Sequence, residues 1–180
     1  MPDRVIAYVG LGSNLENPRQ QLARAFQALR KLRESRVIAR SSLYSSPPMG
    51  PPGQPDYLNA VVALQTRLSA PVLLTALQRI ESAQGRVRKQ HWGPRTLDLD
   101  LLLYADQVSA QPALTLPHPG IATRAFVLYP LAEIAPDLIV TGLGPIADLL
   151  RRCPLAGLER LPELDVSARG MQAGGHDRTH

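Results

Sequence analysis

Cysteine, lysine and aromatic side chains are scarce in this sequence of 180 residues, and long apolar runs are absent. The single cysteine, Cys153, excludes an internal disulfide and suits a reducing compartment. No apolar run approaches the roughly 18 residues that a membrane-spanning helix needs, and the first residues lack the pattern of a signal peptide. We therefore expect a cytoplasmic protein that does not associate with a membrane.

Three sequence signatures of nucleotide and hydrolase chemistry are also missing. The segment 10–14, GLGSN, does not complete G-x-G-x-x-G, because Leu15 stands where the last glycine belongs. The chain has no P-loop motif and no serine in a G-x-S-x-G elbow. These absences argue against the Rossmann, P-loop and elbow-type hydrolase classes. We interpret segment 10–14 as a tight turn between a strand and a helix, where Asn14 could still contact a ligand.

Arginine supplies nearly all of the positive charge. The net charge is +5, and only Lys31 and Lys89 among the 20 basic residues are lysine. Arginine binds phosphate in a bidentate manner, so the charge fits either nucleic acid or a small polyanion such as a nucleotide. A general bias of composition explains most of the arginine content, but not the cluster at 86–95.

The order of the predicted elements is β-α-β-β-α-β. The predicted ranges are a strand at 4–10, a helix at 18–32, strands at 37–45 and 57–66, a helix at 71–84, a strand at 97–104, and later helices at 125–134 and 146–150. This order predicts an α+β protein of the ferredoxin-like, split βαβ type, with a mainly antiparallel sheet and helices packed on one face. We expect one domain, 1–166, and a disordered tail, 167–180, because the tail is polar and has no periodicity. The proline-rich segment 46–56 is predicted to be a functional loop.

The stretch WGPRTLDLDLLLY, residues 92–104, carries the clearest chemical signal. Leucine and aspartate alternate from Leu97 to Leu101, and side chains of a strand alternate between its two faces. The leucines would therefore enter a core. Asp98 and Asp100 would share the other face, with Cα atoms roughly 6–7 Å apart.

Two carboxylates side by side repel each other unless a positive group lies between them. Arg86, Arg88 and Arg95 precede this strand and could bind phosphate, and carboxylate oxygens are ligands that Mg²⁺ prefers. We therefore predict a magnesium and polyphosphate site. A solvated strand face with surface salt bridges is the simpler alternative for the aspartates. For His118, a structural role and phosphate binding both remain open.

Several segments together resemble the 6-hydroxymethyl-7,8-dihydropterin pyrophosphokinases of the folate pathway. They lie in the same order along the chain, at 8–15 (YVGLGSNL), 44–61 (YSSPPMGPPGQPDYLNAV), 73–81 (LLTALQRIE), 85–104 (GRVRKQHWGPRTLDLDLLLY) and 116–137 (LPHPGIATRAFVLYPLAEIAPD). The resemblance implies transfer of the β,γ-pyrophosphoryl group of ATP to the hydroxymethyl oxygen of the pterin, which leaves AMP. It also implies two Mg²⁺ ions held by Asp98 and Asp100, ATP as co-substrate, and a protein that is a monomer.

The same resemblance implies roles for individual residues. Arg86 and Arg95 would be catalytic together with the two aspartates. The pterin would be bound by Ser46, Pro47, Met49, Tyr57, Asn59, Trp92 and Phe126. The nucleotide would be bound by Gln78, Glu81, Arg88, Leu101, His118 and Arg124. His91 stands before Trp92 where the family often has arginine, so a cationic contact from this loop would depend on pH.

The competing class is a small basic domain that binds RNA. Such domains stack bases on aromatic residues of an exposed sheet, whereas this chain has only two phenylalanines and a predicted sheet with two aspartates. Without a metal, those aspartates would repel a phosphate backbone. We therefore expect ATP and a pterin as ligands, and no nucleic acid. A catalytically inactive relative is disfavoured because the aspartate pair is intact.

Overall fold

The computed structural model of the chain describes residues 3–15, 17–48, 50, 52–85 and 97–162. The main sheet contains β1 (Val5–Ser13), β2 (Ser35–Arg40), β3 (Tyr44–Ser46), β4 (Tyr57–Thr66), β5 (Asp98–Tyr104) and β10 (Glu159–Arg160). The helices are α1 (Pro18–Arg30), α2 (Ala70–Ala83), α3 (Ala125–Ile134) and α4 (Ile146–Arg152). Two small hairpins pair β6 (Ser109–Gln111) with β7 (Leu114–Leu116), and β8 (Ile139–Val140) with β9 (Gly144–Pro145). Among the described residues, no helix is both long and apolar enough to cross a bilayer.

The strand order is that of the predicted ferredoxin-like fold. The sheet runs β10-β3-β4-β1-β5, and β2 also pairs with β4. Every pair in it is antiparallel. The four strands of the split βαβ pattern therefore lie in the order β2-β4-β1-β5, with α1 and α2 as the two connecting helices. The α+β prediction is confirmed.

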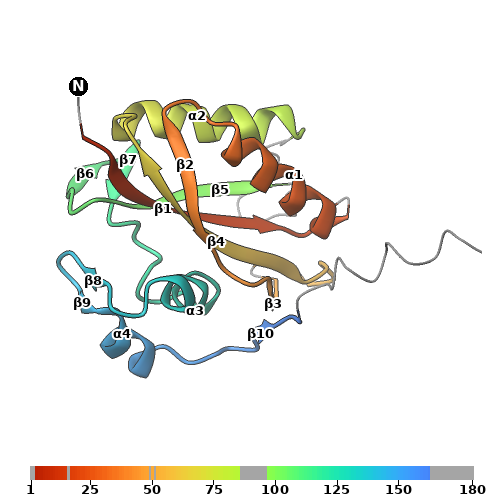
Figure 1. Cartoon of the computed structure of the whole chain (residues 1–180). Helices are drawn as coiled ribbons and strands as arrows, with labels where there is room; N and C mark the ends of the chain where they lie inside the picture. Colours follow the sequence, from red (N-terminus) through yellow and green to blue (C-terminus); the bar gives the residue numbers. More distant parts are fainter. Residues whose placement is uncertain (1–2, 16, 49, 51, 86–96, 163–180) are drawn as a thin grey trace, which may run out of the picture.

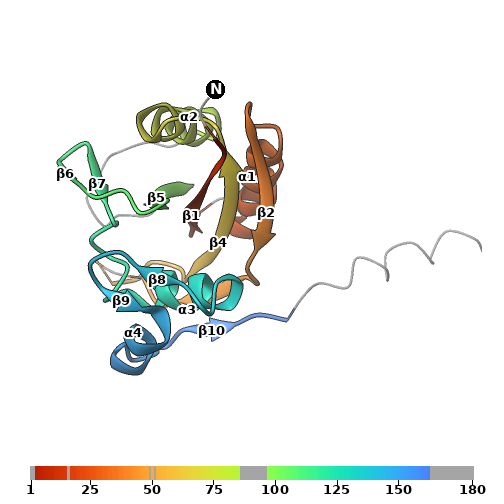
Figure 2. The same cartoon turned by 60° about the vertical axis from the view of Figure 1, so that its left-hand side comes forward.

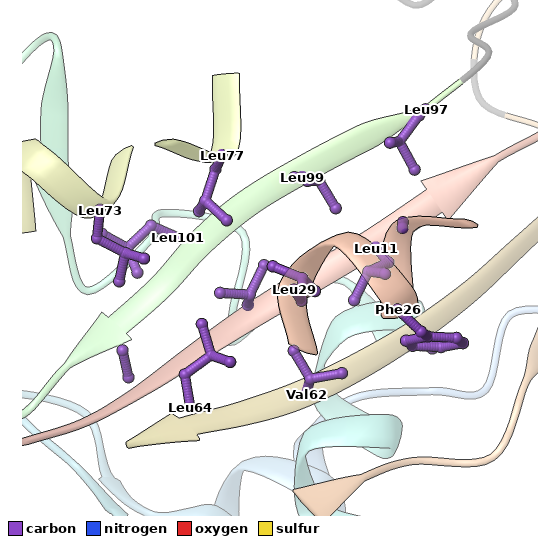
Figure 3. Close-up of a cluster of buried hydrophobic side chains, with 14 of the residues drawn as sticks. Leu11, Phe26, Leu29, Val62, Leu64, Leu73, Leu77, Leu97, Leu99 and Leu101 are labelled. Carbon is purple, nitrogen blue, oxygen red and sulfur yellow. The ribbon is translucent and has the colours of Figure 1, made fainter. Parts of the chain in front are cut away.

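Helices cover both faces of this sheet (Figures 1 and 2). On one face α1 and α2 pack against alternate residues of β1, β4 and β5, including Val9, Val62 and Leu99 (Figure 3). On the other face α3 and α4 form a second core with the intervening positions, among them Val61 and Leu102. The prediction that helices cover only one face is therefore wrong. The physical reason is that β4 and β5 carry apolar residues on both faces, so each face needs a cover.

Local signals explain where most elements begin. Asn17 caps α1 by accepting a hydrogen bond from the Gln20 N–H (3.5 Å), with Pro18 in the first turn. Ser69 caps α2 in the same way through the Val72 N–H (3.4 Å). The predicted ranges of β4 and α3 agree with the structure, and α3 continues through Pro130.

Two sequence predictions need correction. The predicted strand 37–45 is two strands, because the chain leaves the β2 ladder at Ser41, whose side-chain oxygen accepts the Val61 N–H (2.9 Å). The predicted tight turn at 10–14 is wrong as well. Strand β1 continues to Ser13 and pairs with β4 and β5 along that length, so Gly10 and Gly12 are strand residues.

Candidate active site

One glycine of the central strand β1 forms the floor of the site. Gly12 pairs with Asn59 of β4 on one side and with Asp98 of β5 on the other. Gly10 is likewise flanked by Val61 and Asp100, but the space over it is filled by Leu102, whose Cδ1 lies 3.5 Å from the position of a Cβ at Gly10. Side chains of directly opposite residues lie on the same face of a sheet, so Gly12 leaves a trough between Asn59 and Asp98. A Cβ atom at Gly12 would lie 3.4 Å from Asn59 Oδ1, at the bottom of this trough.

The two aspartates lie on the face that the sequence predicted. Leu97, Leu99 and Leu101 are buried in the core beneath α2, whereas Asp98 and Asp100 are half-buried. Because side chains alternate along the strand, the two carboxylates share the face opposite to α1 and α2. They lie at the same end of the sheet as Asn59.

The β4 side of the trough is polar and well ordered by hydrogen bonds. Asn59 is 4% exposed. Its Nδ2 donates to Ser46 Oγ (2.8 Å) and to the Tyr44 carbonyl (3.4 Å), both on β3. Tyr57 lies two residues earlier, half-buried, and its Cδ1 is 3.9 Å from the position of a Cβ at Gly12. Pro47 follows Ser46 and is exposed.

The segment between β7 and α3 supplies the basic side of the site. His118 is anchored to β5 by its backbone N–H, which donates to the Leu102 carbonyl (2.9 Å). Its Nδ1 accepts the Gly120 N–H (3.0 Å), so in the neutral imidazole Nε2 carries the proton and is a donor. Arg124 crosses over Gly120, where a Cβ would come within 2.7 Å of Arg124 Cδ. Its Cζ lies 6.0 Å from the Phe126 ring centroid.

Burial and charge act together on His118. Burial lowers the pKa of His118 from its ordinary value, the Asp100 carboxylate opposes this shift, and Arg124 adds to it. The lowered pKa favours the neutral imidazole. It remains a hydrogen-bond donor through Nε2, and Arg124 contributes the positive charge at this point.

Three predicted nucleotide residues lie away from the aspartate face. Leu101 is 4% exposed within the core beneath α2, so its side chain cannot reach a ligand in the trough. Glu81 is buried on α2 and its Oε2 accepts the Leu99 N–H of the edge strand β5 (3.3 Å). Gln78 is exposed on α2. The structure brings none of these three side chains to the trough.

Some predicted site residues lie outside the described residues. They are Met49, Arg86, Arg88, Trp92 and Arg95, together with His91 and the tail 167–180. The structure says nothing about their placement, and their roles remain predictions.

Sequence reasoning missed the residues that shape the site without contributing a functional group. Gly12 forms the floor and Gly120 makes room for Arg124. The signal for the first was the alternation of Gly10 and Gly12 within a strand-like run. The sequence leaves open whether Asn14 contacts a ligand. Its Nδ2 donates to the Pro55 carbonyl (3.2 Å), and thus connects the end of β1 to the loop before β4.

The donor set fits a magnesium ion that arrives with a polyphosphate. Among the described residues, no three side chains of histidine, cysteine, aspartate or glutamate gather into a cluster. Mg²⁺ is commonly bound by one or two carboxylates together with water and substrate phosphates. Asp98 and Asp100 provide such a pair, with His118 and Arg124 beside them to contact phosphate.

Comparison with known proteins points to one family. A family model described as 7,8-dihydro-6-hydroxymethylpterin-pyrophosphokinase (HPPK) matches residues 8–136. The chain is 52% identical over 155 residues to a 2-amino-4-hydroxy-6-hydroxymethyldihydropteridine pyrophosphokinase of Pseudomonas aeruginosa, which covers 86% of this chain and 96% of that protein. A protein of the same name from Haemophilus influenzae is 47% identical over 148 residues, covering 82% of this chain and 92% of that protein.

The fold is also similar to solved structures. One is the crystal structure of wild-type Plasmodium falciparum HPPK-DHPS with SDX-DHP, with a TM-score of 0.66 and 13% sequence identity. The match covers 84% of this chain and 45% of that one, so this chain spans less than half the length of that structure. At this identity the likeness concerns the fold alone. Because the family model and the bacterial relatives match most of the sequence, the chain belongs to the 7,8-dihydro-6-hydroxymethylpterin-pyrophosphokinase family.

Proposed function

We propose that the protein transfers the terminal diphosphate of ATP to 6-hydroxymethyl-7,8-dihydropterin, giving AMP and the pterin diphosphate, a step of folate synthesis. Family membership supports this activity, and the relatives at 52% and 47% identity are named as pyrophosphokinases of this kind. The site contains the two chemistries that such a reaction needs, a slot for a flat polar ring and a polyphosphate site.

The row Asn59–Gly12–Asp98 across three strands is the observation that carries the proposal. Neighbouring strands are about 4.8 Å apart, so the backbones of Asn59 and Asp98 lie about 10 Å apart. A ring held at Asn59 would therefore direct a substituent over Gly12 toward the aspartates.

The reaction breaks one bond and forms one. The hydroxymethyl oxygen bonds to the β-phosphorus, the bond from this phosphorus to the α,β-bridging oxygen breaks, and AMP leaves. The hydroxyl proton passes to solvent or to a phosphate oxygen. Such transfers depend mainly on positioning and on neutralising charge.

The residues of the chain then have distinct tasks. Asp98 and Asp100 would hold two Mg²⁺ ions, which neutralise phosphate charge and align the reacting oxygens. His118 donates from Nε2 to a phosphate oxygen, and Arg124 adds a positive charge. Arg86, Arg88 and Arg95 are assigned to the same polyphosphate. Trp92 is assigned to the closing of the loop at 85–95 over the site, which would exclude water.

The pterin is assigned to the β4 side of the trough. Tyr57 and Phe126 offer aromatic faces for stacking. Asn59 pairs with the polar edge of the ring, with Ser46, Pro47 and Met49 alongside. The protein is proposed to act as a monomer.

A turnover assay tests the proposal directly. The protein is incubated with ATP, Mg²⁺ and 6-hydroxymethyl-7,8-dihydropterin, and the nucleotide products are separated. We expect AMP and pterin diphosphate in equal amounts, and no turnover in excess chelator. Release of ADP, or turnover without a divalent cation, would contradict the proposal. A parallel titration with single-stranded RNA tests the RNA-binding alternative, for which tight binding would be required.

A further inference from the structure

A half-buried carboxylate on α3, that of Glu133, connects three elements behind the pterin side of the trough. Glu133 Oε2 accepts hydrogen bonds from the Ser42 N–H (2.7 Å) and the Ser42 hydroxyl (3.2 Å). Its Oε1 accepts the Tyr44 hydroxyl (2.6 Å) and lies 3.6 Å from Arg160 Nε. The side chain of Glu133 is only 20% exposed, so these charge-assisted contacts are weakly screened by solvent.

Glu133 of α3 and the strand β10 both contact the short strand β3. β3 has three residues, and β10 pairs with its outer edge through Ser45 and Tyr44. The Leu161 N–H donates to the Leu43 carbonyl (2.8 Å), and Arg160 Nε also donates to Ser42 Oγ (3.1 Å). A three-residue strand has little intrinsic stability of its own. Pairing with β4 holds its inner edge, and α3 and β10 hold the rest of it in place.

The position of β3 in turn fixes the side-chain amide of Asn59. Both acceptors of Asn59 Nδ2, Ser46 Oγ and the Tyr44 carbonyl, belong to β3. With Nδ2 held there, the amide turns Oδ1 toward Gly12 and the trough. A shift of β3 that breaks the bond to Ser46 Oγ would release the amide to rotate. Either Oδ1, an acceptor, or Nδ2, a donor, could then face the ligand.

The geometry points to Glu133 as a positioning residue for pterin recognition, which acts through β3 and Ser46 on the orientation of the Asn59 amide. It does not contact the site itself. The inference rests on the proposed pterin pyrophosphokinase activity and extends it to a residue on the opposite side of β3. It separates pterin binding, which depends on β3, from nucleotide binding, which uses β5 and the segment before α3.

The test compares two affinities in one variant. Glu133→Gln keeps the size of the side chain but removes the charge and places an N–H₂ group among donors. We expect the dissociation constant for the pterin to rise about tenfold, because hydrogen bonds to a charged acceptor are among the stronger ones. Affinity for a non-hydrolysable ATP analogue with Mg²⁺ should change less than about twofold. Isothermal titration of each ligand measures both.

A second variant distinguishes positioning from general support of the fold. In an Asn59→Ala background, Glu133→Gln should have almost no further effect on pterin affinity, because its effect passes through the missing amide. Equal losses in both backgrounds would overturn the inference. Tyr129→Phe is the matched control, since it removes a hydrogen bond from the same helix to the Cys153 carbonyl (2.9 Å) and leaves β3 untouched. Its pterin affinity should match the wild type.

The experiments distinguish a failure of the proposed function from a failure of the inference about Glu133. If wild-type protein produces no pterin diphosphate, the proposed function fails. If wild-type protein is active and Glu133→Gln binds the pterin as tightly as wild type, only the present inference fails. Should Glu133→Gln not fold in thermal unfolding measurements, Tyr44→Phe removes one hydrogen bond of the same set. A pterin-specific loss of about threefold is then expected, and an unchanged affinity would overturn the inference.

Discussion

The two faces of the main sheet belong to the same strands but carry different side chains. On the face beneath α1 and α2, apolar side chains continue along β5 from Leu97 to Leu101. On the other face, the core beneath α3 and α4 stops short, and Asn59 and the aspartates occupy the rest. Within one strand, Leu97, Leu99 and Leu101 therefore stabilise the fold, while Asp98 and Asp100 lie on the face proposed to bind the ligand. Stability and chemistry should be separable by substitutions at adjacent residues.

The largest expected contrast lies between Asp98 and Leu99. Asp98→Ala and Asp100→Ala should each lower kcat by at least about 10²–10³-fold, because each removes a carboxylate that would bind Mg²⁺ and the charge on the phosphates is then less well neutralised. Leu99→Ala should leave kcat near wild type but lower the free energy of unfolding by about 2–5 kcal/mol. Steady-state kinetics and urea unfolding of the three variants measure both quantities.

The double variant Asp98→Ala/Asp100→Ala sharpens this contrast. Its loss of kcat should be far smaller than the product of the two single losses, because both residues act on one metal cluster. Multiplicative losses would show that the two carboxylates act separately.

The two phenylalanines offer a second contrast, one on each face. Phe126→Ala, like Tyr57→Ala, should weaken pterin binding about tenfold through lost stacking and burial, with little change for ATP. Phe26, a residue of α1 that is 8% exposed, is the control. Phe26→Ala should destabilise the fold by about 3–5 kcal/mol without a selective loss of pterin affinity. If Phe126→Ala impaired ATP alone, the assignment of the pterin side would be wrong.

Gly120→Ala should act on the nucleotide and spare the fold. The added Cβ would meet the Arg124 side chain at 2.7 Å, and a flexible arginine can move aside. We expect the affinity for an ATP analogue to fall about threefold as Arg124 leaves its position. The melting temperature and the pterin affinity should be nearly unchanged.

The smallest expected effect is a difference in alkaline stability between two tyrosines. Burial and the Glu133 carboxylate raise the pKa of Tyr44, whereas burial alone raises that of Tyr104 on the other face. A raised folded-state pKa contributes stability that is present below the unfolded value of about 10 and is lost as pH rises through the folded value. As the pH rises, the free energy of unfolding should therefore decrease less in Tyr44→Phe than in Tyr104→Phe. Denaturant unfolding at about pH 8 and about pH 11 measures this, and equal changes would contradict it.

The sequence was sufficient where a side-chain pattern acts locally. The alternation around Asp98 assigned both faces of β5 correctly, and the ranges of β4 and α3 agree with the structure. The same local signals placed Asn17 at the start of α1.

Where partners are distant along the chain, the sequence was not sufficient. The break between β2 and β3 depends on Ser41 and Ser42, which bond to Val61 and Glu133. The role of Glu133 depends on β3 and β10, which are far from it in sequence. Likewise, the apolar residues of α3 did not reveal which face of the sheet they cover. The closing of the loop at 85–95 over the site is part of the proposed function, and it stays a prediction.

Strand β5 contains a bulge beside Tyr8 and Val9 of β1, where the register shifts between Leu101 and Leu103. Leu102 and Leu103 both join the core beneath α3, and the strand gains one residue without turning its aspartates to the other face. An insertion or deletion of a single leucine at this point would therefore leave the positions of Asp98 and Asp100 intact. The Leu102 carbonyl, however, anchors the backbone of His118 (2.9 Å). A change in the length of this strand would therefore be felt at His118, even where the alternation that places the two aspartates is kept.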